Sequence, residues 1–400
     1  MKILFVAISG SIHTARWINQ VSNLGWDIRL FDCIDDTGYI NPELRNATVY
    51  HSIYSPQTGL DPSVKLQGLR LPIGNSRIKR WLLKRQPNYR VRRLARLIQQ
   101  FQPDIIYSLE FQHSSYMVLE ARQWLKNQGV THFPKWIVFN WGSDIYLFNR
   151  MADHKQRIYE LLQQADYYEC ECQRDVHIAQ ELGMKAIPLP IAPVAGGIDL
   201  QLATQLRLVE KPSARRIIAM KGYQNWAGRA LFGLRALELC ADVLQSYKVV
   251  MFSAVPFDDM QIAATLFSQK TGIPIEIVPG GQPHSAILEL LASARLYIGL
   301  SISDGISTSM LDAISVGAFP IQSNTACADE WVTDGETGML VPPEDPQAIA
   351  AAIRRALTND ALVDQAAERN AKVCEDHLDA RKIREQVIDM YTTIAKQHQS

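Results

Sequence analysis

The chain has 400 residues, of which 47% are hydrophobic and 20% charged, and its 41 basic and 41 acidic residues give a formal net charge of zero. This is the composition of an ordinary globular protein, and it excludes a disordered or fibrous chain. The length predicts two domains, and no apolar run approaches the roughly 18 residues that a membrane-spanning helix needs. The six scattered cysteines have no paired Cys-x-x-Cys spacing, which favours reduced cytoplasmic thiols over disulfides or a metal site.

In the first half of the chain, short β-type runs alternate with helical patterns. The apolar opening at 3–8 is too short for a signal peptide and indicates a buried first strand. The strands expected in this half are 2–8, 27–31, 104–108 and 136–140. The expected helices are 13–24, 114–127, 153–164 and 173–182. Such alternation predicts βαβ units and a mostly parallel sheet.

Proline and glycine interrupt this pattern between residues 187 and 215, which indicates an interdomain linker at 191–213. A second series follows, with strands expected at 216–220, 248–252, 275–278, 295–300 and 319–322. Its expected helices are 226–244, 258–270, 285–293, 345–357, 360–375 and 379–395. The fold class is therefore α/β, with two doubly wound domains at 1–190 and 214–378. A cleft between them would receive ligands at the carboxyl ends of the strands.

The segment from Leu300 to Phe319 carries the strongest functional signal. An apolar run at 294–300 leads into a polar loop and a short helix. The polar residues at the expected helix start are Ser307, Thr308 and Ser309. A helix N-terminus presents unpaired N–H groups and a positive dipole end, which suit a phosphate. Asp304 on the loop and Asp312 on the helix would bind hydroxyls on either side, and the combination predicts a nucleotide-sugar site.

Residues 294–343 resemble the C-terminal half of the retaining GT-B glycosyltransferases of family 4, the glycosyl transferases group 1. The family pattern S-x-x-E-G-x5-L-E-A-M-A-x-G is matched here by Ser301, Asp304, Gly305, Leu311, Asp312, Ala313, Ile314, Ser315 and Gly317. The run from Asp334, DGETGMLVPPED, is similar to the DG-x-x-G-x-L-V-x-x-x-D of the family. Both signature acids are Asp where the family usually has Glu, so each carboxylate lies one methylene nearer the backbone. A catalytically reduced relative therefore stays open.

The resemblance implies a GT-B fold, in which two Rossmann-like domains face each other across a cleft and the helix at 379–400 returns to the first domain. It also implies transfer of a hexosyl unit from a nucleotide-diphosphate sugar to a hydroxyl of a glycan or lipid-linked glycan. The anomeric configuration is retained, and neither a metal nor a cofactor is expected, because fixed cations and the helix N-terminus stabilise the departing diphosphate.

The same resemblance assigns roles to residues of the second domain. Lys221 and Arg229 would hold the diphosphate, with Arg235 as the alternative to Arg229. Asp304 would contact the donor sugar and Asp312 the ribose. The remaining donor-binding positions are Gly305, Ser307, Thr308 and Ser309.

Two short motifs place the acceptor side in the first domain. The run SGSIHTARW at 9–17 resembles the GS-x-H-T-x-R-W opening of a subset of these transferases, and WGSD at 141–144 resembles their HGSD or WGSD. The acceptor-side residues expected from these motifs and from the end of the 104–108 strand are Gly10, His13, Arg16, His113 and Asp144. Structural roles stay open for three of them: capping or packing for the two histidines, and a helix cap for Asp144.

A basic stretch without acidic residues lies between positions 62 and 103. Its eleven basic residues are Lys65, Arg70, Arg77, Lys79, Arg80, Lys84, Arg85, Arg90, Arg92, Arg93 and Arg96. Three interpretations of this stretch stay open. It is a solvated helical face, it binds an anionic acceptor glycan, or residues 65–96 contact an anionic membrane surface or a lipid-linked acceptor. Nucleic acid ranks last, because no nucleic-acid-binding fold is recognised. The expected location is the cytoplasm, with peripheral contact at the inner face of the membrane left open.

Two other functions stay open beside the transferase. A nucleotide-sugar epimerase on the same fold would interconvert free nucleotide sugars and would form product without an acceptor. A non-catalytic binder of nucleotide sugars or glycans would show affinity without turnover, which the two Asp-for-Glu differences permit.

Overall fold

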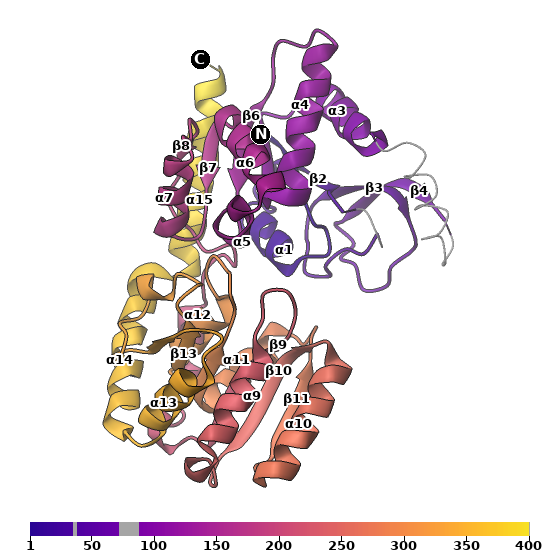
Figure 1. The fold of residues 1–400 in the computed structure, drawn as a ribbon. Coiled ribbons are helices and arrows are strands. Elements are labelled where there is room, and N and C mark those ends of the chain that lie inside the picture. Colours follow the sequence, from indigo (N-terminus) through magenta and orange to yellow (C-terminus); the bar gives the residue numbers. More distant parts are fainter. Residues whose placement is uncertain (35–37, 72–87, 400) are drawn as a thin grey trace. The chain divides into compact units, whose positions relative to one another are not determined.

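The computed structural model describes residues 1–34, 38–71 and 88–399 (Figure 1). The chain forms two compact units. The first unit comprises Met1–Gly196 and the chain from Arg381 onward, and the second unit comprises Gly197–Ala380. Helix α8 (Leu200–Arg207) lies inside the range expected as linker and belongs to the second unit.

The first unit is built on a parallel sheet in the order β4-β3-β2-β1-β5-β6-β7-β8, counting the described strands. The strands are β1 (Lys2–Ala7), β2 (Asp27–Asp32), β3 (Thr48–Tyr54), β4 (Lys65–Arg70), β5 (Ile105–Leu109), β6 (Lys135–Phe139), β7 (Tyr167–Glu169) and β8 (Ile187–Pro188). Its helices are α1 (Ile12–Asn19), α3 (Tyr89–Phe101), α4 (Tyr116–Asn127), α5 (Ser143–Tyr146), α6 (Ala152–Gln164), α7 (Gln173–Glu181) and α15 (Ala380–Gln399). Short turns are the π-helix η1 (Phe111–Ser115) and the 3₁₀ turn η2 (Phe148–Arg150).

The second unit has a parallel sheet in the order β11-β10-β9-β12-β13-β14. The strands are β9 (Ile217–Tyr223), β10 (Lys248–Val255), β11 (Ile275–Pro279), β12 (Ala294–Gly299), β13 (Phe319–Ser323) and β14 (Met339–Val341). The other helices of this unit are α9 (Ala230–Leu239), α10 (Phe257–Thr271), α11 (His284–Ser293), α12 (Thr308–Ser315), α13 (Pro346–Leu357) and α14 (Asp360–His377). Its 3₁₀ turns are η3 (Pro212–Ala214), η4 (Ala241–Val243) and η5 (Ala328–Glu330).

The prediction of two doubly wound α/β domains is confirmed, because both sheets are parallel and helices connect most of their strands (Figure 1). The strand order reverses between β1 and β5 in the first unit and between β9 and β12 in the second. Such reversal points open a crevice at the carboxyl ends of the strands, where parallel sheets bind ligands. The motifs singled out from the sequence follow β1, β9 and β12.

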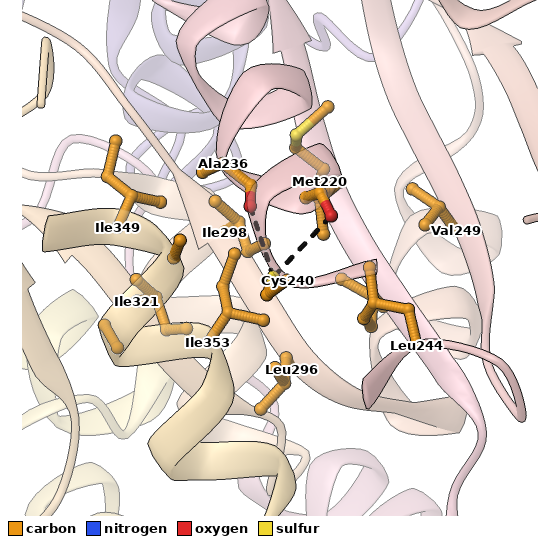
Figure 2. Close-up of a cluster of buried hydrophobic side chains, with 14 of the residues drawn as sticks. Met220, Ala236, Cys240, Leu244, Val249, Leu296, Ile298, Ile321, Ile349 and Ile353 are labelled. Carbon is orange, nitrogen blue, oxygen red and sulfur yellow. Dashed lines mark hydrogen bonds between the residues drawn. The ribbon is translucent and has the colours of Figure 1, made fainter. Parts of the chain in front are cut away.

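The core of the second unit shows why the apolar runs were readable as strands. Ile298 of β12 and Ile321 of β13 point at Ile349 and Ile353 of α13, and all four side chains are buried (Figure 2). Cys240 at the end of α9 donates its thiol hydrogen to the carbonyl of Ala236 at 3.2 Å (Figure 2). A strand buried on both faces has a continuous apolar run, which is the pattern of 296–300 and 319–321.

The C-terminal helix α15 completes the first unit. Tyr391 of α15 is fully buried, and its hydroxyl accepts a hydrogen bond from Trp17 Nε1 at 3.1 Å. Its ring lies 5.7 Å from that of Tyr107 and 6.1 Å from that of Trp26, measured between centroids. The last helix therefore supplies core side chains to a unit whose other elements end before residue 197.

A buried glutamate makes the first unit sensitive to pH. Glu169 of β7 is 1% exposed and accepts a hydrogen bond from the Tyr107 hydroxyl at 2.6 Å. Burial raises the pKa of Glu169 from 4.5 to about 8, and the Tyr107 hydrogen bond offsets part of that rise. Between these two values the folded protein retains a proton that the unfolded chain has released, so stability falls as pH rises through this range.

Replacement Glu169→Gln is expected to remove this dependence. The free energy of unfolding of the variant, relative to wild type, should rise between pH 5 and pH 8 by up to about 1.4 kcal/mol per pH unit. Urea unfolding at several pH values measures it, with the exposed Glu181→Gln as the control. A wild-type-to-variant difference that stays constant with pH would contradict the assignment.

None of the helices in the described part of the chain combines the length and the apolar character that crossing a membrane requires.

Candidate functional site

The reversal point of the second sheet brings Lys221, Tyr297 and the acidic loop after β12 together. Burial alone would lower the pKa of the Lys221 ammonium, yet its pKa is raised overall because ionisable acidic groups surround it. These groups are, in order of effect, Tyr297, Tyr223, Asp304 and Asp312. Lys221 Nζ also lies 4.6 Å from the centroid of the Tyr223 ring. The site therefore holds a partly buried ammonium whose pKa is influenced by both acidic residues predicted from the sequence.

Helix α12 begins with an open N-terminus. Ser307 occupies the N-cap position, but its side chain caps no backbone N–H of the helix. Its hydroxyl lies 3.1 Å from the Tyr297 hydroxyl instead. The helix then starts at Thr308 and Ser309, as predicted, and the Gly305 N–H donates to Asp304 Oδ1 at 3.0 Å. An uncapped helix N-terminus leaves backbone N–H groups that favour an anion.

Asp312 has a partner that the sequence analysis missed. His284 Nε2, at the start of α11, lies 2.9 Å from Asp312 Oδ2. The Asp312 side chain is 8% exposed and the His284 side chain 37% exposed. The position of His284 after β11, at the same edge of the sheet, was the available signal. The His284 imidazole therefore places a second polar group beside the Asp312 carboxylate.

Arg229, for which a diphosphate contact is expected, is bound within the chain itself. Its Nε lies 2.5 Å from Glu344 Oε1, and its side chain is 16% exposed. Its Nη1 donates to backbone carbonyls at 3.0 to 3.4 Å. These carbonyls belong to Asn225, Trp226, Ala227 and Gly228. The guanidinium thus organises the loop between β9 and α9, while the alternative Arg235 pairs with Glu238 at 2.5 Å.

In the first unit, the β1–α1 loop and helix α1 hold three of the predicted residues, Gly10 in the loop and His13 and Arg16 in the helix. A Cβ added to Gly10 would lie 2.9 Å from Tyr39 Cδ1, so packing against Tyr39 requires glycine here. The His13 ring lies 5.8 Å from the Trp141 ring, which joins this loop to the WGSD motif. Arg16 Nε lies 3.7 Å from Glu43 Oε2.

Asp144 and His113 meet around Glu110, a residue that the sequence analysis did not select. Asp144 is buried and accepts hydrogen bonds from the backbone N–H groups of Trp141 at 2.8 Å and Phe111 at 3.3 Å. Burial, and next the charge of Glu110, raise the pKa of Asp144 to about 8. Glu110 Oε2 lies 3.2 Å from His113 Nδ1, and this hydrogen bond raises the pKa of His113. Asp144 therefore binds two backbone N–H groups, and its acceptor role stays a prediction.

The backbone of Glu110 is strained. Its φ of 72° and ψ of 155° are unusual for any residue other than glycine. The carboxylate accepts from the backbone N–H groups of His113 and Ser114, at 2.8 and 2.6 Å, and so caps the π-helix η1. Strain and a π-turn therefore lie at the end of β5, beside the reversal point of the sheet.

The basic stretch is described only in part, because residues 72–87 and their five basic side chains lie outside the described residues. Arg90 donates to the carbonyls of Asp32 at 2.6 Å and Ile34 at 2.9 Å, so it organises the end of β2. Arg92 and Arg96 are exposed on α3. Membrane or glycan contact through 65–96 stays a prediction.

Two family models match the chain. The model described as glycosyl transferase 4-like matches residues 2–167, and the model of glycosyl transferases group 1 matches residues 267–373. Compared with curated proteins by sequence, the chain matches none.

Solved structures share the fold at low identity. Sucrose-phosphate synthase from Thermosynechococcus elongatus is 16% identical with a TM-score of 0.69, over 98% of this chain and 99% of that chain. HepE of Anabaena, solved with UDP-glucose, is 15% identical with a TM-score of 0.65, over 98% of this chain and 100% of that one. OtsA without ligand is 12% identical with a TM-score of 0.68, over 98% and 99%. The chain therefore belongs to the group 1, or family 4, glycosyl transferases and has their GT-B fold.

Proposed function

We propose that this protein moves a hexosyl unit from a nucleotide-diphosphate sugar to a hydroxyl of a glycan or lipid-linked acceptor, with retention at the anomeric carbon and without a metal. The observation that carries the proposal is the raised pKa of Lys221, to which Tyr297, Tyr223, Asp304 and Asp312 contribute, together with the uncapped start of α12, whose Ser307 hydroxyl lies 3.1 Å from the Tyr297 hydroxyl. A diphosphate there would meet an ammonium and backbone N–H groups, while the carboxylates would accept from sugar hydroxyls.

In the proposed reaction, the bond between the anomeric carbon and the diphosphate oxygen breaks as the acceptor oxygen attacks the same face. The acceptor proton passes to the departing phosphate oxygen, so no separate protein base is needed. Lys221 and the N–H groups of Thr308 and Ser309 stabilise the negative charge that develops on the leaving group. Groups fixed where charge develops lower the barrier most.

The two carboxylates have different proposed partners. Asp304 lies on the loop before α12 and contacts the donor sugar. Asp312, together with His284, contacts the ribose, because the imidazole 2.9 Å away extends the reach of the short side chain. For Arg229 we propose an indirect role, since its guanidinium holds the β9–α9 loop and Glu344. Arg229 would therefore support the site without touching the diphosphate.

On the acceptor side we propose Gly10, His13, Arg16, His113 and Asp144, with Glu110 added. Glu110 fixes Nδ1 of His113, whose side chain is 57% exposed. The His113 Nε2 atom can then face a substrate hydroxyl. The neighbouring Asp144 is protonated around neutral pH because its pKa is raised to about 8, which limits the negative charge buried behind the imidazole.

Calorimetric titration of the wild-type protein with UDP, GDP and ADP tests the donor site first. Binding of one diphosphate in the micromolar range would support the proposal and name the base. The matching nucleotide sugars are then incubated with and without saccharide acceptors, and the anomeric configuration of the product is assigned by NMR. Product formed without acceptor would favour the epimerase, and binding without turnover would favour the binder. Failure of all three diphosphates to bind would overturn the proposal.

A further inference from the structure

A cavity in the first unit lies at the amino ends of the strands, the opposite edge of the sheet from the predicted acceptor-side residues. Its volume is about 760 Å³, within the range of small-molecule sites. Residues from the end of α4, the loop at 128–134, the start of β6 and the end of α6 line it. Lys135 begins β6 at the cavity, and the WGSD motif follows Phe139, about 13 Å further along the strand at 3.3 Å per residue. A ligand here would therefore lie apart from the proposed acceptor side.

The wall of this cavity carries more positive than negative charge. Arg122, Lys126 and Lys135 line it, whereas Asp166 is the single acid among the described lining residues. Both oxygens of Asp166 already have partners: Oδ1 lies 3.3 Å from Lys135 Nζ, and Oδ2 accepts from the Trp136 backbone N–H at 3.0 Å. Within the described part of the chain, neither Arg122 nor Lys126 forms an ion pair with a carboxylate. The cavity therefore has two cations whose charge is not neutralised by contact.

Arg122 is held in place by groups that carry no charge. Its Nη1 donates to the carbonyl of Gln164, and its guanidinium carbon lies 5.0 Å from the centroid of the Phe133 ring. Since a guanidinium has five N–H donors, these contacts leave donors for a ligand. Burial lowers the pKa of Arg122, and the charge of Asp166 offsets part of that effect. A half-buried cation without a carboxylate in contact is stabilised by a bound anion.

We propose that this cavity binds a phosphorylated sugar, with the phosphate on Arg122 and Lys126. A guanidinium can donate two parallel hydrogen bonds to a phosphate, and an ammonium adds a compact charge. The cavity is larger than a phosphate alone requires, and the Thr131 hydroxyl and the Gln164 amide in its wall suit the sugar hydroxyls. Because this site uses no residue of the proposed donor or acceptor sites, the inference is independent of the proposed function.

The experiment is calorimetric titration with glucose 6-phosphate, mannose 6-phosphate, inorganic phosphate and glucose. We expect at least one sugar phosphate to bind the wild-type protein, inorganic phosphate to bind more weakly and glucose not to bind. Arg122→Gln should weaken sugar-phosphate binding about tenfold and Lys126→Gln about threefold, because each substitution removes a cation from the phosphate. Lys155→Gln is the matched control, since Lys155 is exposed near the start of α6, at the end remote from the cavity.

Two further measurements separate this site from other effects. Circular dichroism checks the fold of Arg122→Gln, and the exposed Lys126 keeps the test valid if that variant does not fold. Lys221→Ala should bind the sugar phosphate as wild type does, and loss of binding there would assign the probe to the donor site and overturn the inference.

Three other results would also overturn it. The first is a wild-type protein that binds neither sugar phosphate. The second is sugar-phosphate affinity in Lys126→Gln equal to that in Lys155→Gln. The third is inorganic phosphate that binds as tightly as the sugar phosphates, which would reduce the cavity to a plain anion site.

Discussion

Lys221→Ala should weaken binding of the cognate nucleoside diphosphate at least tenfold, or about 1.4 kcal/mol, and lower transfer by roughly 10²- to 10³-fold. Two causes combine. The diphosphate loses its ammonium partner, and the carboxylates of Asp304 and Asp312, which raise the pKa of Lys221 in the wild type, are left to repel it. The larger effect on turnover follows because negative charge grows on the leaving group as the glycosidic bond breaks.

Calorimetry for the diphosphate and initial rates for transfer measure the two effects. Lys248→Ala is the control, since Lys248 stands on the neighbouring strand β10, is 47% exposed and pairs with Glu276 instead of the candidate site. Its replacement should leave both quantities within about twofold, as expected for an exposed ion pair. Equal diphosphate affinity in the two variants would show that Lys221 does not hold the donor.

Tyr391→Ala should cost about 3–5 kcal/mol of stability, the usual range for removing a large buried aromatic side chain. The ring is fully buried among Trp17, Trp26 and Tyr107, and the substitution also removes the acceptor for the indole N–H of Trp17. Because Tyr391 lies on α15, the effect would reveal how strongly this helix stabilises the first unit.

Urea unfolding, followed through tryptophan fluorescence, measures this loss. Tyr391→Phe keeps the ring and removes only the hydroxyl, so a smaller cost of about 1 kcal/mol is expected. Tyr159→Ala, at a 45% exposed position on α6, should change stability by less than about 0.5 kcal/mol. A Tyr391→Ala protein as stable as Tyr159→Ala would contradict the role of α15 in the core.

The fold was largely readable from the sequence because most strands are buried on both faces. The expected strand at 295–300 corresponds to β12, Ala294–Gly299, whose six residues are all buried. Strand β3 was missed for a physical reason: its inward residues are Val49, His51 and Ile53. The His51 side chain is fully buried beside Asp32, at 3.1 Å. A polar residue that faces the core interrupts the alternation of apolar and polar residues by which a strand is recognised in a sequence.

Helix α3 was not predicted from the sequence because it is rich in arginine. Its apolar stripe includes Leu94, Leu97, Ile98 and Phe101, all buried, but the arginines between them were interpreted as a functional surface. The expected helix at 226–244 likewise begins later, at Ala230, because Asn225 and Arg229 bind the preceding backbone into a loop.

The site was predictable where a motif is local and was missed where partners are distant in the sequence. Lys221, Asp304 and Asp312 come directly from strand ends and one short helix. The pairing of His284 with Asp312 spans 28 positions, and that of Arg229 with Glu344 spans 115. No local pattern encodes such pairs, because they arise only when the parallel strands align their carboxyl ends. The strain at Glu110 is similarly a property of the folded backbone.

The division of the first unit between the two ends of the chain has a consequence for the order of synthesis. The second unit is continuous, so it can complete its core once residue 380 has left the ribosome. The first unit is translated earlier but still awaits its last twenty residues, and until then the surface that receives Tyr391, including Trp17 and Tyr107, has no cover. Domains generally fold as units during synthesis, and exposed apolar surface promotes aggregation. The half of the protein that is made first is therefore finished last, and its core stays incomplete until α15 packs against it.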